Sequence, residues 1–143
     1  MAGATQTLVV DVPRDELFEV IRDYERYPEF LDDMEASRIV RRDGADVEVE
    51  FTLNVIKRIS YTLKLVESAP ERVEWSLVQG MFKRNDGGWT LEELPGGRTR
   101  ATYSIEITIG VFLPGTIVNR LVGKTLPATL QAFKRRAEAL HGG

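Results

Sequence analysis

Cysteine is absent from this 143-residue sequence, and its single histidine, His141, lies near the C-terminus. Without cysteine the chain has no disulfide and no thiolate nucleophile. One terminal histidine leaves almost no material for a Ser-His-Asp triad or for a metal site built from nitrogen and sulfur ligands. We therefore expect no bound metal and no cofactor.

Long apolar runs and strong charge are missing as well. The uncharged stretch 107–119 contains Gly110, Pro114 and Gly115 and is shorter than the about 20 residues that cross a bilayer. The first ten residues lack a basic segment followed by an apolar run, so we expect no signal peptide and a cytoplasmic location. The net charge of −3 and pI of about 5.3 predict no binding to DNA and disfavour RNA or the ribosome as a partner.

What the sequence has is enough apolar material for one core. Hydrophobic residues make up 43% of the chain, and the length fits a single domain over residues 1–143. Apolar and polar residues alternate through most of the middle of the chain, which is typical of half-buried strands. Turn signals between them, such as Asp43-Gly44 and Pro95-Gly96-Gly97, predict an antiparallel sheet. The expected strands are 5–12, 37–42, 47–55, 59–65, 73–79, 89–91 and 101–109.

Two helical regions flank this run of strands. Pro13 is suited to open a helix, and Tyr27-Pro28 is expected to end it before a short helical turn at 28–31. The segment 113–140 predicts a long amphipathic helix, with a tolerated kink at Pro127. Asn119 is a polar residue within its apolar stripe, so this helix either covers a filled core or covers a cavity with a few polar groups inside.

Three sequence motifs then indicate a family. Residues 23–31, DYERYPEFL, resemble a D-x-x-x-Y-P-x-F signature, and residues 80–83 and 88–91, GMFK and GWTL, are similar to G-x-F and G-x-W-x-F stretches. All three are features of the polyketide cyclase/dehydrase and coenzyme Q-binding branch (SRPBCC) of the START-like superfamily. The resemblance implies an α+β helix-grip fold, in which a curved antiparallel sheet of about seven strands (β-α-α-β6-α) wraps around a long C-terminal helix. The polar segment 84–87 and Leu91, where an aromatic is common, depart from the pattern and leave the ligand open.

In such proteins the space between the sheet and the long helix commonly holds an apolar small molecule. Core aromatics in a filled interior are the alternative interpretation for any single side chain, and Gln79, at the end of its row, is as well suited to a loop. Asp32-Asp33 and Glu92-Glu93 are poor acid/base pairs, because neighbours on a strand point to opposite faces. The residues predicted to bind the ligand are Phe51, Tyr61, Leu63, Trp75, Leu77, Gln79, Trp89, Tyr103, Ile105, Asn119, Val122 and Leu126.

The leading hypothesis is non-catalytic binding or transport of an apolar small molecule, such as a lipid, a quinone or a polyketide-like compound. The first alternative is a polyketide cyclase, aromatase or dehydrase, for which the sequence offers only Tyr61 and Tyr103 with an ordinary pKa near ~10 and Asn119 as a carbonyl polariser. The second is a protein-interaction module similar to ribosome-associated members of the branch. Residues 81–84 are expected to form a loop in which Met81 or Phe82 packs on the core, with contact to a membrane or a partner as the alternative. Catalytic residues and oligomeric state are left unassigned.

Overall fold

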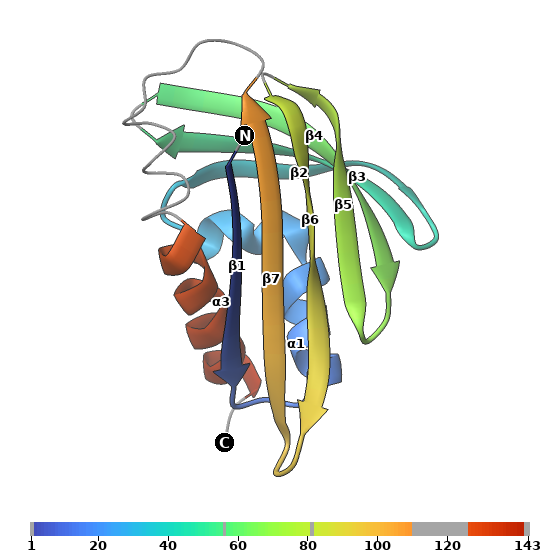
Figure 1. The fold of residues 1–143 in the computed structure, drawn as a ribbon, viewed down its shortest axis with the longest axis vertical. Coiled ribbons are helices and arrows are strands. Elements are labelled where there is room, and N and C mark those ends of the chain that lie inside the picture. Colours follow the sequence, from blue (N-terminus) through green and yellow to red (C-terminus); the bar gives the residue numbers. More distant parts are fainter. Residues whose placement is uncertain (1, 56, 81, 110–125, 142–143) are drawn as a thin grey trace.

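The computed structural model describes residues 2–55, 57–80, 82–109 and 126–141. Along the chain a strand is followed by a helix, a short 3₁₀ helix, six strands and a C-terminal helix, which is the predicted order (Figure 1). The elements are β1 Ala2–Val10, α1 Arg14–Arg22, η1 Tyr24–Glu29, β2 Met34–Asp43, β3 Asp46–Val55, β4 Lys57–Ser68, β5 Arg72–Gly80, β6 Phe82–Leu94, β7 Arg98–Ile109 and α3 Leu126–His141.

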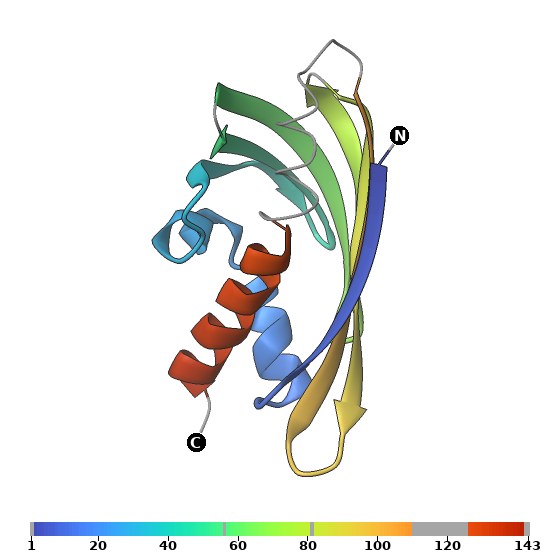
Figure 2. The same ribbon diagram turned by 60° about the vertical axis from the view of Figure 1, so that its left-hand side comes forward.

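The strands form one seven-stranded sheet in the order β1-β7-β6-β5-β4-β3-β2, with every neighbouring pair antiparallel. Successive strands from β2 to β7 are neighbours in the sheet, whereas β1 joins the sheet beside β7, with Thr5 opposite Ser104. The sheet curves around the helices, and α1, η1 and α3 all lie on its concave side (Figure 2). The predicted helix-grip fold is therefore confirmed.

The helices are held against the sheet by their apolar faces. In α1 the buried side chains are Leu17, Phe18, Val20 and Ile21, three or four residues apart for the most part, as a helix with one core-facing side requires. In α3, Leu130, Phe133 and Ala137 are buried and repeat at the same spacing. One large apolar core thus fills the space where α1 and α3 meet the sheet.

The break between the first two helices lies earlier than predicted. Asp23 has a non-helical backbone conformation that ends α1, and η1 then runs through Tyr27 and Pro28 instead of stopping there. Pro28 has no N–H to donate, and it is tolerated because a 3₁₀ helix of this length makes few internal hydrogen bonds.

The expected loop at residues 81–84 was wrong from Phe82 onward. Phe82 opens β6 and is only 5% exposed, packing with Ile59 and Ile107 in a second, smaller apolar cluster. The side chain of Phe82 is therefore not available for the membrane contact considered above, and Met81 lies outside the described residues.

A glycine in β6 lets two strands and an indole come close together. Gly87 lies opposite Trp75 of β5 and Ile105 of β7. A Cβ at position 87 would clash with the Ser104 carbonyl oxygen and would approach Trp75 Cζ2 and Ile105 Cα to 2.9 Å each. Packing therefore requires glycine at position 87, two residues before Trp89, because a larger side chain would collide with β7 and Trp75.

Only part of the predicted long helix can be compared with the structure. The described part of α3 runs from Leu126 to His141 and includes Pro127. The expected helix over 113–125, and hence the kink, lies outside the described residues. Within the described part of the chain, no helix is long and apolar enough to cross a membrane.

Candidate functional site

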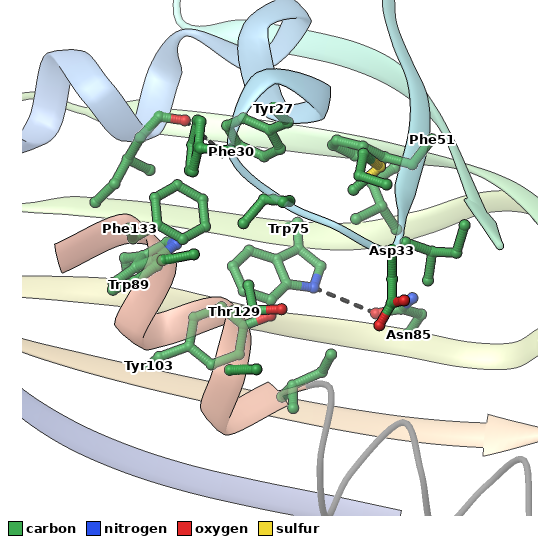
Figure 3. A pocket seen from close by; sticks show the side chains of 18 of the residues that line it. Tyr27, Phe30, Asp33, Phe51, Trp75, Asn85, Trp89, Tyr103, Thr129 and Phe133 are labelled. Atoms are coloured by element: carbon green, nitrogen blue, oxygen red, sulfur yellow. Dashed lines mark hydrogen bonds between the residues drawn. The ribbon is translucent and has the colours of Figure 1, made fainter. Parts of the chain in front are cut away.

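A cavity of about 500 Å³ lies between the concave face of the sheet, the η1–β2 segment and α3 (Figure 3). Strands β3 to β7 supply its floor, the segment from Tyr27 to Met34 covers one side, and Ala128, Thr129 and Ala132 of α3 cover another. Most of its lining side chains are apolar or aromatic. The exposed lining residues Asp32, Ala128 and Arg135 mark where the cavity reaches the surface.

Eight aromatic rings form a continuous chain around this space. Neighbouring centroids are 4.9–5.9 Å apart, within the range in which offset or edge-to-face ring pairs attract one another. Rings packed in this way hold each other in place, so the wall of the cavity is largely pre-formed. The order is Phe82, Tyr61, Phe51, Tyr27, Phe133, Trp89, Tyr103 and Trp75.

The segment that covers the cavity is tied to the rest of the fold by charged contacts. The Tyr24 hydroxyl donates to Glu67 at 2.8 Å, and Arg22 and Arg42 pair with the same carboxylate. Burial by itself would raise the pKa of Glu67, but the hydrogen bonds from Arg42 and Tyr24 and the two guanidinium charges lower it overall. On the other side, Arg136 of α3 pairs with Glu29 of η1 at 2.8 Å. These contacts fix η1 against both the sheet and α3.

Two tyrosines, Tyr61 and Tyr103, line the cavity. Burial raises the pKa of both Tyr61 and Tyr103 well above its usual range, and the nearby Tyr61 raises that of Tyr103 further. The sequence-based expectation of an ordinary pKa was therefore wrong, because it took no account of desolvation. Both phenols stay protonated near neutral pH, so neither serves as a general base. The Tyr27 hydroxyl, in contrast, donates to the Ile21 carbonyl.

One buried amide also lines the cavity. Asn85 of β6 is 3% exposed, and its Oδ1 accepts a hydrogen bond from Trp75 Nε1 at 3.3 Å (Figure 3). The Asp33 carboxylate lies at the same end of the cavity in this view. Within the described residues, no group of three or more histidine, cysteine or acidic side chains is placed to hold a metal ion.

The structure brings together seven of the residues predicted for the site. They come from β3, β4, β5, β6 and β7 and all lie in the cavity lining. Leu77 is half-buried against both apolar clusters but does not line the cavity. Asn119 and Val122 lie outside the described residues, as does the side chain of Leu126. The seven are Phe51, Tyr61, Leu63, Trp75, Trp89, Tyr103 and Ile105.

The prediction that Gln79 lines the site was wrong, because the structure places Gln79 on the outer face of the sheet. In the β4–β5 register Leu63 lies opposite Leu77, but the next residue back, Thr62, lies opposite Gln79, so Val78 is an extra residue in β5. Such a bulge reverses the alternation of side chains beyond it. Gln79 is accordingly exposed, and strict alternation from Val73 gave the wrong face.

Sequence reasoning missed residues of η1, β6 and α3 that line the cavity. Tyr27 was interpreted as the end of a helix before Pro28, and Asn85 as part of the polar segment 84–87. Phe133 lies within the amphipathic helix predicted over 113–140 but was not among the predicted site residues. A signal for Asn85 was present in the spacing: it lies four residues before Trp89, so it shares the inward face of β6 with it.

Comparison with known proteins places the chain in a family. The family model described as polyketide cyclase/dehydrase and lipid transport matches residues 10–134. The ribosome association toxin RatA of Vibrio cholerae is 21% identical, and that of Pseudomonas aeruginosa 24%, over 99% and 96% of both chains respectively.

Solved structures agree with the fold. The Zhui aromatase/cyclase of a Streptomyces strain has a TM-score of 0.86 at 17% identity, covering 96% of this chain and 93% of that one. An 18 kDa protein from Caulobacter crescentus has a TM-score of 0.78 at 27% identity and covers both chains completely. The resemblance inferred from the motifs is confirmed for the family: the chain belongs to the polyketide cyclase/dehydrase and lipid transport family.

Proposed function

We propose that the protein binds a neutral, largely apolar small molecule in the cavity beneath α3 and does not transform it chemically. The observation that carries the proposal is the cavity itself, about 500 Å³ in volume and walled by a chain of eight aromatic rings. Small-molecule sites typically have this size and an apolar wall with a few placed polar groups.

The charges around the cavity favour a neutral ligand. The lining residues that carry a charge are Asp32, Asp33 and Arg135, and of these Asp32 and Arg135 are exposed. The deeper polar groups, Tyr61, Asn85 and Tyr103, are uncharged near neutral pH. Burying a charged ligand group against them would cost several kcal/mol of desolvation. An apolar body with a few polar atoms fits this wall better.

The lining argues against catalysis by acid/base chemistry. A cyclase or dehydrase needs a positioned group whose pKa lies near the working pH. The raised pKa values of Tyr61 and Tyr103 move these phenols away from that range. His141 lies at the end of α3 beside Glu16, with 3.9 Å between Nδ1 and Oε2, and is not part of the lining.

Association with the ribosome is a second candidate, favoured by the names of relatives that align over nearly the whole chain. The outer face of the sheet offers it little support. Several cations there are already paired with acids, including Arg38 with Glu50 and Arg58 with Glu35. Cations that are already paired with acids neutralise few RNA phosphates, so they release few counterions and add little binding affinity. Co-sedimentation with ribosomes in a sucrose gradient at moderate salt tests this candidate, which predicts protein in the ribosomal fractions.

Tryptophan fluorescence tests the leading proposal. Both tryptophans of the chain line the cavity, so a quinone such as 1,4-naphthoquinone should quench their emission saturably, with a Kd in the low micromolar range, roughly −8 kcal/mol. The same titration with Ala132→Phe, which places a ring in the cavity, should show no saturable phase. Quenching that rises linearly with quinone in both proteins means collisions in solution and contradicts the proposal.

A further inference from the structure

The buried amide of Asn85 has a fixed orientation. An indole N–H is only a donor, so the 3.3 Å bond from Trp75 Nε1 requires an acceptor and assigns Oδ1 of Asn85 to that side. The Nδ2 group must then point away from Trp75. Trp75 is itself held by the close approach of Gly87 and by the ring of Tyr103, 5.2 Å away. The tryptophan thereby orients the amide.

The Nδ2 group of Asn85 is left facing the cavity. Within the described part of the chain, the bond from Trp75 is the hydrogen bond found for this side chain. Among the described residues, Ser37 Oγ is the side-chain atom that is fully enclosed and has no hydrogen-bond partner, and Asn85 Nδ2 is not such an atom. Nδ2 therefore keeps some exposed surface. Because Asn85 belongs to the lining and is 97% buried, the space that Nδ2 reaches is the cavity. A buried donor of this kind is costly unless something accepts from it.

We propose that Asn85 Nδ2 donates a hydrogen bond to a carbonyl oxygen of the ligand, which makes Asn85 the residue that selects ketones and quinones over hydrocarbons of the same shape. This inference rests on the proposed function. A carbonyl oxygen accepts without bringing a donor of its own, so it pairs one of the two N–H groups of Nδ2 and adds no further unpaired donor. Asp33 lies at the same end of the cavity (Figure 3), and its carboxylate disfavours an anionic oxygen there.

A pair of rigid probes isolates this hydrogen bond. Fluorenone and fluorene differ only in a carbonyl group against a methylene group, and both are neutral and aromatic. The affinity of each is measured for wild type and for Asn85→Leu, and the ratio of the two affinities is compared between the proteins. This cycle cancels the difference in hydration between the probes. We expect the preference for fluorenone to fall about 3–10-fold in Asn85→Leu, as the loss of one hydrogen bond implies.

Gln79→Leu is the matched control. It also replaces an amide by an isobutyl group, from a side chain one methylene longer, at an exposed position of β5, and it should leave the ratio at the wild-type value. If both probes bind wild type saturably and Asn85→Leu keeps the same ratio, the assignment of Asn85 is overturned while the proposed function stands. If neither probe binds wild type saturably, the proposed function fails, and this inference fails with it.

A measurement on wild type keeps the proposal testable even if Asn85→Leu does not fold. In the ¹⁵N-labelled protein the side-chain amide signals of Asn85 are assigned against Asn54 and Asn119, the other asparagines of the chain. Fluorenone should shift the Asn85 side-chain protons downfield, and fluorene should not. Equal shifts with both probes, or no shift with either one under saturating conditions, would overturn the proposed hydrogen bond.

Discussion

Two alanines of the same helix provide a direct test of whether the space under α3 is a cavity. Ala132 and Ala137 are both buried, 7% and 0% exposed. Ala132 lines the cavity, whereas Ala137 belongs to the packed core and does not. Replacing each by phenylalanine adds the same ring at the two positions, so the difference between the variants reports on the space that each ring meets.

The two substitutions should change the free energy of unfolding in different ways. At position 132 the ring adds roughly 100 Å² of apolar surface that can be buried in the cavity, about 2.5 kcal/mol at 25 cal/mol per Å². About 1 kcal/mol of this is lost to fixing the side chain, so Ala132→Phe should be unchanged or stabilised by up to ~1.5 kcal/mol. At position 137 the ring has no such space, and overpacking should destabilise the protein by ~1–3 kcal/mol or more.

Urea unfolding with a parallel binding titration measures both effects. A change of midpoint at constant slope reports stability and not a changed unfolded state. We expect Ala132→Phe to keep its midpoint and lose quinone binding, and Ala137→Phe to lose stability and keep binding in its folded fraction. Equal destabilisation of both variants, with binding unaffected by either, would refute the argument that the cavity is an open binding space.

Three further predictions concern named contacts. Glu67→Gln should lower the free energy of unfolding by about 1–2 kcal/mol at pH 7, because Arg22 and Arg42 lose their charged partner. Since the pKa of Glu67 is lowered in the folded state, the stability that Glu67 contributes is present above the unfolded pKa near ~4.3 and is lost as the pH falls through the folded pKa. In urea melts, the difference in stability between wild type and Glu67→Gln should therefore be smaller at pH 3 than at pH 7. An equal difference at both pH values would count against this role of Glu67. Tyr61→Phe and Tyr103→Phe should each reduce ligand affinity by no more than one hydrogen bond, ~0.5–1.5 kcal/mol, whereas a loss of ~10²–10⁴ in rate in a cyclisation or dehydration assay would identify an enzyme. Gly87→Ala should destabilise the protein by ~1–3 kcal/mol and change the near-ultraviolet circular dichroism of Trp75, and a variant with wild-type stability and spectrum would contradict the close packing at that position.

Element order and fold were predictable because they depend on repeated local signals. The alternation in β3, β4 and β7 follows from burial of one face of the sheet, and turns such as Asp43-Gly44 fix the antiparallel pairing. The structure has Gly44 at a φ of 61° and Gly96 at 81°, the left-handed conformation that made these turns recognisable. Each of these signals lies within a few residues along the chain.

The candidate site was only partly predictable because its remaining parts depend on contacts between distant segments. The bulge at Val78 is set by how β5 pairs with β4, and it turned Gln79 outward against the local pattern. Asn85 gains its role only beside Trp75, ten residues earlier on the neighbouring strand. Tyr27 reaches the cavity because η1 folds across the sheet and meets Phe51 and Phe133. None of these positions is specified by periodicity alone.

Native mass spectrometry of the freshly purified protein tests the central claim most directly. Wild type and Ala132→Phe are expressed and purified side by side without detergent, and each is measured again after incubation with fluorenone. The account predicts that wild type gains one fluorenone, or already carries a non-covalent molecule of a few hundred daltons, on the order of what a site of this volume holds, and that Ala132→Phe shows neither. A wild-type protein that stays at its bare mass before and after incubation, indistinguishable from Ala132→Phe, would contradict the claim that this cavity binds a small molecule.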